Sequence, residues 1–479
     1  MEAEKKYAET YGGKVGGILP LLGMIAAIVV LCFTGMSSLR NFWGAGFMAM
    51  VIGLLVFKDK NRYAKAVMKG FANPSFTMLF PIFIAAGILS QILTAAHLVD
   101  GLVYLVSLVN IPPAIIPCVT FVLCAVMSTV TGSSAAALLA TMPMLFPMGV
   151  QMGCPAGLVL GAICSGSEFG NNLSPISDVT ITSSIGQEVD IIAAVRTRVW
   201  YSLAAGIPAL ILFFVFGLAT TKGVDLASLS VDSSSSLGLI FIIIPILVAV
   251  LILRKTNFLV ALVVGDLLGI ILLLILGYSD VASIFAADGL LASGTLSLMD
   301  VLVFMALIFV VLALTEEVGV LDSFQTFMVR HAKTPRMAET VSGVFTCIFC
   351  AIIGSGMSTI AFISPIVRNI MKPFHIARTR AANYIAGFAS GISWMVPHGV
   401  NTLTALAVAM GTGVVGDDFT MLNFIPYNFF CIGLIVVYWA AILTGIGRKK
   451  DEGGLQNETL WTRTQKADHE MGLLTTNKG

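Results

Sequence analysis

Residues 165–184 read SGSEFGNNLSPISDVTITSS, a polar stretch in the middle of a long apolar region. Of the 479 residues, 57% are hydrophobic and 11% are charged, and the mean hydropathy is +0.95. Soluble domains carry about 25% charged residues. No lysine or arginine occurs in residues 72–194 or 257–328, as is typical of a chain that crosses lipid repeatedly. The composition therefore excludes a soluble fold and predicts an all-α polytopic membrane protein.

The chain contains twelve apolar segments of about the length that spans a bilayer, which takes about 20 residues. Two of them have polar middles that contain a proline, and they are predicted to be broken helices at 156–190 and 377–410. Two further apolar segments, 131–153 and 354–375, begin near Gly-Ser and contain a central proline. We expect these two to form re-entrant hairpins surrounded by protein. The twelve predicted spans are 15–34, 42–57, 75–96, 112–130, 156–182, 199–221, 237–253, 257–277, 298–316, 338–353, 377–410 and 425–447.

The two halves of the chain share landmarks at one constant spacing, which we name the repeat offset and which equals the spacing from Gly132 to Gly354. Duplicated halves with discontinuous helices are typical of secondary transporters. We therefore expect a first repeat at 15–221 and a second repeat at 237–447. The other predicted segments are a cytoplasmic N-terminus at 1–14, a linker at 222–236 and a polar cytoplasmic tail at 448–479. The matching pairs are Asp100 and Asp322, Gly132-Ser133 and Gly354-Ser355, Pro143 and Pro365, Pro175 and Pro397, and Thr180 and Thr402.

Basic residues indicate how the chain is oriented. They gather before the first span and in residues 58–69, after the second span, and cytoplasmic loops carry an excess of lysine and arginine. We expect a multi-pass protein of the cell (inner or plasma) membrane with a cytoplasmic N-terminus. Twelve full crossings would make the repeats parallel. The basic residues in 317–337 and their absence from 278–297 favour inversion instead, so the relative orientation stays open.

Pro175 interrupts the stretch at 165–184. Pro397 interrupts the equivalent stretch of the second repeat, which reads GFASGISWMVPHGVNTLTAL at 387–406. Trp394 in this second stretch is expected to serve in packing. Proline has no backbone N–H, so nearby carbonyl groups lose their helical partners. Such carbonyls, together with hydroxyl, amide and carboxylate oxygens, suit Na⁺ or a polar solute. The alternative is a helix-packing network whose polar groups satisfy one another. The candidate cation- or substrate-binding residues are Ser133, Ser134, Glu168, Asn171, Asn172, Ser174, Ser177, Asp178, Thr180, Ser355, Ser358, His398, Asn401 and Thr402, with Asp178, Ser177 and Asn171 as the candidate Na⁺ site.

The block SG-S-E-FGNN-L-SPISD-V-T, followed by SSIG, Asp190 and VRT at 195–197, resembles the NhaC-type Na⁺/H⁺ antiporter family. The resemblance implies a core site made of Ser174, Pro175, Ser177, Asp178 and Thr180. The family has an aspartate where this chain has Asn171. Fewer groups are then left to carry a proton, although Glu168 could supply the missing charge.

The resemblance implies a secondary transporter that exchanges Na⁺ and H⁺, works as an elevator and forms a homodimer in membrane lipid. The alternative is Na⁺- or H⁺-coupled transport of a small organic solute, such as an amino acid or a carboxylate, on the same fold. A channel or receptor is a third hypothesis, which the paired broken helices disfavour. The coupling ions would be Na⁺ and/or H⁺, with no cofactor. The sequence has no motif that predicts an enzyme and no basic tract that predicts a nucleic-acid partner.

Overall fold

The computed structural model describes residues 7–34, 39–109, 112–221, 233–254, 256–319, 332–416 and 418–448. Parts of three predictions lie outside these residues, namely 1–6 of the N-terminus, 222–232 of the linker and 449–479 of the tail. Asp322, one member of the repeat pairs, lies outside them as well.

Helices make up nearly all of the described chain, and the only β pairing in that part is one isolated bridge between Thr10 and Phe57. Among the described residues, eight helices are long and apolar enough to cross a membrane, or nine if the bent pair α21–α22 forms one span. The prediction of an all-α polytopic membrane protein is confirmed. The predicted spans 42–57 and 237–253 correspond to shorter apolar helices.

The helices of the first half are α1 (Gly13–Phe33), α2 (Leu39–Val56), α3 (Lys60–Phe71), α4 (Pro74–Ala95), α5 (Leu98–Val109), η1 (Pro113–Ile115), α6 (Ile116–Thr131), α7 (Ser134–Gln151), α8 (Ala156–Leu173), α9 (Asp178–Gln187) and α10 (Ile191–Thr220). Those of the second half are η3 (Ser233–Ile242), α11 (Ile243–Leu253), α12 (Phe258–Ile275), α13 (Val281–Phe285), α14 (Leu290–Ser297), α15 (Met299–Glu317), α17 (Pro335–Ile353), α18 (Gly356–Met371), η4 (Lys372–Phe374), α19 (Arg378–Ser393), α20 (Val400–Gly411), α21 (Met421–Phe424), η5 (Ile425–Tyr427) and α22 (Phe429–Thr444).

Helices in the two halves begin at positions separated by the repeat offset. This holds for the starts of α7 and α18, of α8 and α19, and of α9 and α20. The two polar stretches are therefore interrupted at matching places, between α8 and α9 and between α19 and α20. The repeat boundaries at 15–221 and 237–447 stay predictions.

The chain reverses at Gly132, between α6 and α7, and at Gly354, between α17 and α18. Both glycines are left-handed, with φ of 68° and 67°, a conformation that favours a residue without Cβ. Each segment that follows is one helix with its proline inside. This corrects the predicted hairpin bounds 131–153 and 354–375, which cover only the second arms. The chain reverses at the two glycines, and the prolines lie inside continuous helices.

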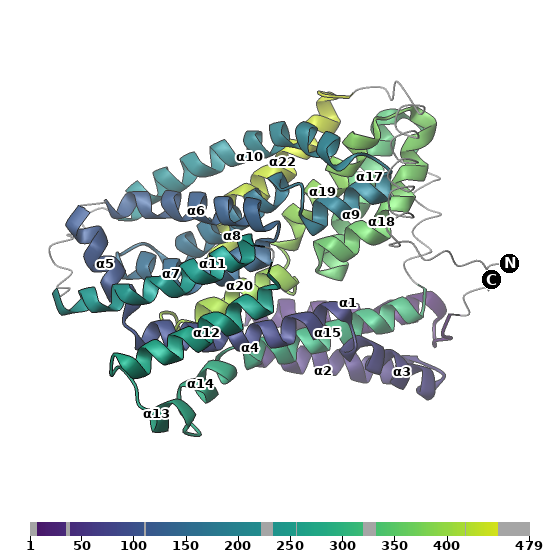
Figure 1. Cartoon of the computed structure of the whole chain (residues 1–479). Coiled ribbons are helices and arrows are strands. Elements are labelled where there is room, and N and C mark those ends of the chain that lie inside the picture. The colour runs from purple at the N-terminus through teal and green to yellow at the C-terminus, as the bar shows by residue number, and fades with distance from the viewer. Residues whose placement is uncertain are drawn as a thin grey trace, which may run out of the picture.

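The two hairpins, α6–α7 and α17–α18, lie toward opposite ends of the molecule (Figure 1). The first hairpin packs on α8, and its second arm also packs on α20. The second hairpin packs on α19, and its second arm also packs on α9. Each hairpin therefore supports its own broken helix and reaches the distal segment of the other one. This is an inverted arrangement.

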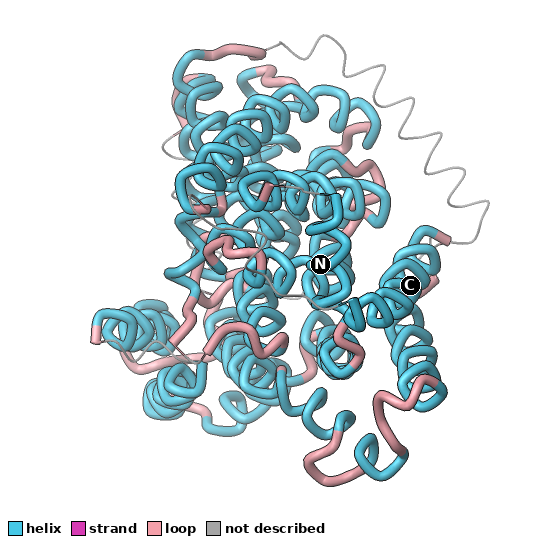
Figure 2. The backbone as a smooth tube through the Cα atoms, turned by 90° about the vertical axis from the view of Figure 1, so that its left-hand side faces the viewer, coloured by secondary structure: helices cyan, strands magenta, loops and turns pink. Residues whose placement is uncertain are grey.

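A second group of helices lies beside this assembly. In Figure 1, α1, α2, α3, α4 and α15 form the lower part, whereas α8, α10, α19 and α22 lie above them. Helix α15 packs on α2 and α3, while α10 packs on α22. Helix α20 contacts both groups, because it packs on α7 and α8 and also on α4 and α15. Figure 2 shows the described backbone as helices joined by loops.

The break between α8 and α9 lies beside the long helix α10. Helix α10 has 30 residues, a length of about 45 Å at 1.5 Å per residue. A Cβ atom on its Gly206 would meet the ring of Phe169 on α8, and its Arg198 binds Thr180 on α9. The break between α8 and α9 therefore faces the part of α10 between Arg198 and Gly206, well inside the length of that helix.

A buried ion cluster joins three helices at one end of the assembly. The Glu339 carboxylate on α17 is fully buried and accepts hydrogen bonds from Arg380 Nε on α19 (2.8 Å) and from Arg448 Nη2 after α22 (2.5 Å). Arg380 also donates to the carbonyl oxygens of Ala441 and Ile446. The cluster fixes the end of α22 against α17 and α19.

Candidate functional site

The first break runs from Ser174 to Ser177, around Pro175. Ser177 caps α9 by accepting a hydrogen bond from the Thr180 amide (3.5 Å). The Asp178 side chain is exposed and accepts from the Val179 amide (2.8 Å). These two side chains satisfy N–H groups that the first turn of a helix leaves without backbone partners.

The second break runs from Trp394 to Gly399. Here the Thr402 hydroxyl donates to the Ser393 carbonyl (3.3 Å), which is one of the carbonyls that the end of α19 leaves free. Asn401 Nδ2 donates to the Ser393 hydroxyl (3.5 Å). His398 is buried, and its Nε2 has no hydrogen-bond partner among the described residues.

Each hairpin tip lies against the break of its own repeat. A Cβ atom on Gly132 would lie 2.7 Å from Cγ1 of Ile176, and one on Gly354 would lie 3.1 Å from the His398 carbonyl oxygen. Ile176 and His398 are themselves related by the repeat offset. The Gly354 carbonyl also accepts a hydrogen bond from the Val400 amide (2.9 Å). The tips therefore shape both breaks in the same way.

The candidate serines at the tips have structural partners. Ser133 and Ser355 cap α7 and α18 through their hydroxyl oxygens. Ser355 also donates to the Ser358 hydroxyl (3.2 Å). Ser134 is buried in the first turn of α7. These groups build the tips, and ion binding by them stays a prediction.

Glu168 is the buried carboxylate at the centre of the assembly. It is 1% exposed, and its Oε2 accepts a hydrogen bond from Trp394 Nε1 (2.7 Å). Ser390 and Asn171 also lie beside the carboxylate. Within the described part of the chain, Oε1 has no hydrogen-bond partner. One oxygen is thus held by the second repeat, and the other is free for a ligand.

Glu168 and Ser390 occupy equivalent positions in the two repeats, because the repeat offset carries one onto the other. Asn172 and Trp394 are equivalent in the same sense. Glu168 and its equivalent Ser390 lie side by side, and this closeness marks the axis that relates the two repeats. We name Glu168, Asn172, Ser390 and Trp394 the axial cluster. The sequence interpretation assigns Trp394 to packing and does not select Ser390. The repeat offset was the signal that could have found both.

Several buried oxygen and nitrogen atoms near this axis have no hydrogen-bond partner among the described residues. An unpaired buried polar group costs about 1–3 kcal/mol, so a group of this size indicates a site that receives an ion, water or a polar solute. The atoms without a partner in the axial cluster are Glu168 Oε1, both polar atoms of the Asn172 side chain and Ser390 Oγ. Those nearby, on α8 and its C-cap residue, are Ser167 Oγ, Asn171 Oδ1 and Ser174 Oγ.

The candidate Na⁺ site of Asp178, Ser177 and Asn171 is divided by the break. Asn171 is buried on α8, whereas the Ser177 and Asp178 oxygens cap α9. Among the described residues there is also no group of three or more His, Cys, Asp or Glu side chains that could hold a metal ion. A Na⁺ site at these three residues stays a prediction.

Arg198 is a fully buried cation that sequence reasoning missed. Its guanidinium donates to Thr180 Oγ1 (2.8 Å) and Ser183 Oγ (3.2 Å) on α9 and to Asn383 Oδ1 (3.0 Å) on α19. It therefore ties the distal segment of one broken helix to the proximal segment of the other. Its place directly after the VRT tripeptide gave no sign of this role.

Two interrupted helices, two opposed hairpins and a buried carboxylate between them define a membrane transporter built from two repeats. Residues 14–218 match the model of the Na⁺/H⁺ antiporter family. This match and the similarity to curated Na⁺/H⁺ antiporters confirm the resemblance expected from the sequence.

Two curated relatives match nearly the whole chain. The "Malate-2H(+)/Na(+)-lactate antiporter" of Bacillus subtilis (strain 168) is 28% identical over 88% of this chain and 93% of its own length. The "Na(+)/H(+) antiporter NhaC" of Alkalihalophilus pseudofirmus is 23% identical over 91% of this chain and 97% of its own length.

Two solved structures are also similar to the chain. Neisseria gonorrhoeae MtrF has 15% sequence identity and a TM-score of 0.39 and covers 89% of this chain and 96% of its own. The YdaH transporter of Alcanivorax borkumensis has 11% identity and a TM-score of 0.36 and covers 78% of this chain and 88% of its own.

Proposed function

We propose that this transporter exchanges Na⁺ for H⁺ and that both ions compete for Glu168. The observation that carries the proposal is the Glu168 carboxylate, buried beside the repeat axis with one oxygen held by Trp394 and the other without a partner among the described residues. Carboxylate, amide and hydroxyl oxygens are suitable ligands for a hard cation, and Asn171 supplies a free amide oxygen nearby.

The cost of burying charge couples the two ions. A bare carboxylate at membrane depth is unfavourable by roughly 2.5–3.5 kcal/mol on insertion scales. Either one Na⁺ or one H⁺ neutralises Glu168, and bound Na⁺ excludes the proton. The site would therefore move across the membrane when it is loaded with one ion or the other, and rarely when it is empty. That restriction makes transport an exchange.

The membrane arrangement belongs to the same proposal. Helices α3 and α18 lie at one end of the molecule in Figure 1. Both helices carry basic residues, and we assign this end and the N-terminus to the cytoplasm. The α6–α10 and α17–α22 assembly would move as an elevator against α1, α2, α4 and α15. A homodimer embedded in lipid would hold the latter group still.

The test is Na⁺-driven proton movement in proteoliposomes that contain a pH-sensitive dye. Glu168→Gln keeps the shape of the side chain but cannot be ionised, so we expect the Na⁺-dependent signal to fall to the level of empty vesicles. Glu316→Gln, which changes an exposed carboxylate at the end of α15, serves as the matched control and should transport normally. Full exchange by Glu168→Gln, together with its loss in Asp178→Asn, would move the ion site to Asp178.

Exchange of organic acids is the second candidate function. Arg198 favours it, because this buried cation is bound by neutral side chains alone among the partners that the described structure records, and a carboxylate substrate needs a positive partner. The malate and lactate exchange named for the Bacillus subtilis relative supports it as well. If Na⁺ alone moves no protons but malate or lactate does, this candidate replaces the first. Stimulation by unlabelled solute on the opposite side would identify a carrier and exclude a channel.

A further inference from the structure

A cavity of about 460 Å³ opens where α9, α18 and α19 meet. We name it the basic cavity, and its polar lining includes Gln187, Glu188, Arg368, Lys372, His375 and Arg378. The helices α9, α18 and α19, which meet at this cavity, lie at the same end of the molecule as α3 (Figure 1). Neither Arg198 nor any residue of the axial cluster lines the basic cavity. It is therefore separate from the proposed ion site.

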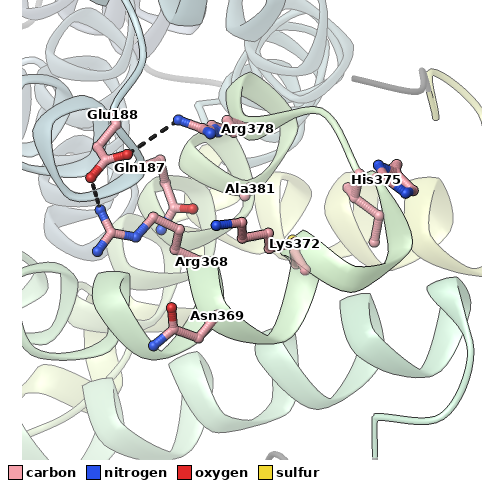
Figure 3. A pocket seen from close by; sticks show the side chains of 10 residues that line it. Gln187, Glu188, Arg368, Asn369, Lys372, His375, Arg378 and Ala381 are labelled. Atoms are coloured by element: carbon pink, nitrogen blue, oxygen red, sulfur yellow. Dashed lines mark hydrogen bonds and ion pairs between the residues drawn. The ribbon is translucent and has the colours of Figure 1, made fainter. Parts of the chain in front are cut away.

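The charges around the basic cavity do not balance. Arg368, Lys372 and Arg378 bring three positive charges to the lining, and Glu188 brings one negative charge. Glu188 forms ion pairs with Arg368 and with Arg378 (3.2 Å). Lys372 has no recorded ion pair within the described residues, and its ammonium group points toward Gln187 in Figure 3. The lining therefore keeps two more positive charges than negative ones.

Glu188 demonstrates that the wall of the cavity can hold an oxyanion. It ends α9 in a left-handed conformation (φ 54°), which is uncommon for a residue with a side chain. Guanidinium groups from α18 and α19 converge on its carboxylate from two sides (Figure 3). Guanidinium presents a fork of donors that matches carboxylate and phosphate oxygens. Glu188 thus occupies a place that a second oxyanion could take.

We propose that the basic cavity binds an oxyanion with two negative charges and that Glu188 is a tethered competitor for the same arginines. Lys372 would contact the incoming anion directly. The phosphate group of a soluble molecule and the phosphate of an anionic lipid headgroup share this chemistry. The proposal does not depend on ion exchange at Glu168, because the lining and the axial cluster have no residue in common.

The test measures binding of inorganic phosphate to the purified full-length protein at constant ionic strength, which holds charge screening fixed. We expect saturable binding that weakens by roughly tenfold in Lys372→Gln, the loss expected for one charge-assisted hydrogen bond. Binding should strengthen in Glu188→Gln, because the internal competitor is gone. Lys333→Gln removes an exposed charge outside the cavity and should bind like the unaltered protein. Misfolding cannot explain opposite shifts in two variants.

A second arm identifies the source of the anion. The same variants are placed in nanodiscs of phosphatidylcholine with or without phosphatidylglycerol, and the rise in thermal unfolding temperature is measured. If phosphatidylglycerol stabilises Glu188→Gln more than the unaltered protein and Lys372→Gln less, the site is assigned to a lipid headgroup. Binding of phosphate alone assigns it to a soluble anion. If neither ligand distinguishes Lys372→Gln and Glu188→Gln from Lys333→Gln, the proposal is wrong.

Discussion

At the scale of single residues, the contact that matters most joins Glu168 to Trp394. The partners are 226 residues apart in the chain, and the indole N–H holds one carboxylate oxygen in place. A hydrogen bond to a charged group contributes about 1.5–3 kcal/mol. Under the exchange proposed above, Trp394 is therefore a positioning residue for Glu168 as well as a packing residue.

Trp394→Phe keeps an aromatic ring but removes the N–H donor. We expect Na⁺/H⁺ exchange to fall by roughly tenfold or more, which corresponds to about 1.4 kcal/mol, while thermal stability changes little. Exchange rates and the apparent KM for Na⁺ in proteoliposomes provide the measurement. Trp200→Phe, at a residue 74% exposed on α10, is the control. Equal activity of the two variants would show that the indole N–H does not position Glu168.

At the scale of elements, the end of α22 is held by an ion cluster rather than by apolar packing alone. Glu339 on α17 is fully buried between Arg380 and Arg448. By contrast, the Glu316–Lys69 pair between α15 and α3 has side chains that are 54% and 61% exposed. The buried cluster and the exposed pair have similar chemistry but very different solvation, so we expect them to contribute unequally to the free energy of unfolding.

Glu339→Gln removes the only negative charge of the buried cluster as the described structure records it. Breaking a buried ion pair by deleting one partner typically costs about 3–5 kcal/mol, whereas an exposed pair contributes about 0–1 kcal/mol. We therefore expect a large fall in unfolding temperature for Glu339→Gln and almost none for Glu316→Gln. Thermal unfolding of the two purified variants side by side decides it. Similar falls in the unfolding temperature of both variants would show that burial does not decide how much an ion pair stabilises this protein.

Composition and the repeat offset predicted the helical class and the two broken helices. The hairpin bounds were wrong because proline is a visible helix breaker, yet Pro143 and Pro365 lie inside helices while Gly132 and Gly354 reverse the chain. The contact of Glu168 with Trp394 could not be read from local pattern, since it forms only when two distant helices pack. Capping roles for Ser177 and Asp178 depend on where α9 begins.

At the scale of the whole molecule, the inverted repeats place the two ends of the assembly on opposite sides of the membrane. Helix α3 with Lys65 lies at one end in Figure 1, and α13 and α14 lie at the other. Basic residues favour the cytoplasmic side. The segment around α13 and α14 has no lysine or arginine, so it should face outward.

Cysteine labelling in intact cells tests this orientation. Asp288→Cys and Lys65→Cys each introduce a thiol at an exposed position. A membrane-impermeant maleimide should label Asp288→Cys in intact cells and Lys65→Cys only after permeabilisation, with the unaltered protein measuring the background from the native cysteines. The reverse pattern would invert the orientation and assign the basic cavity to the outer face.

The pairing of Glu168 with Ser390 has an electrical consequence. These two residues occupy equivalent positions in the two halves of the protein, but one is an acid and the other an alcohol. Under the exchange proposed for Glu168, the axial cluster neutralises a single positive charge per passage. One Na⁺ then leaves for each H⁺ that enters, and no net charge crosses the bilayer. Membrane voltage would do no work on such a cycle, and its direction would follow the two concentration gradients alone.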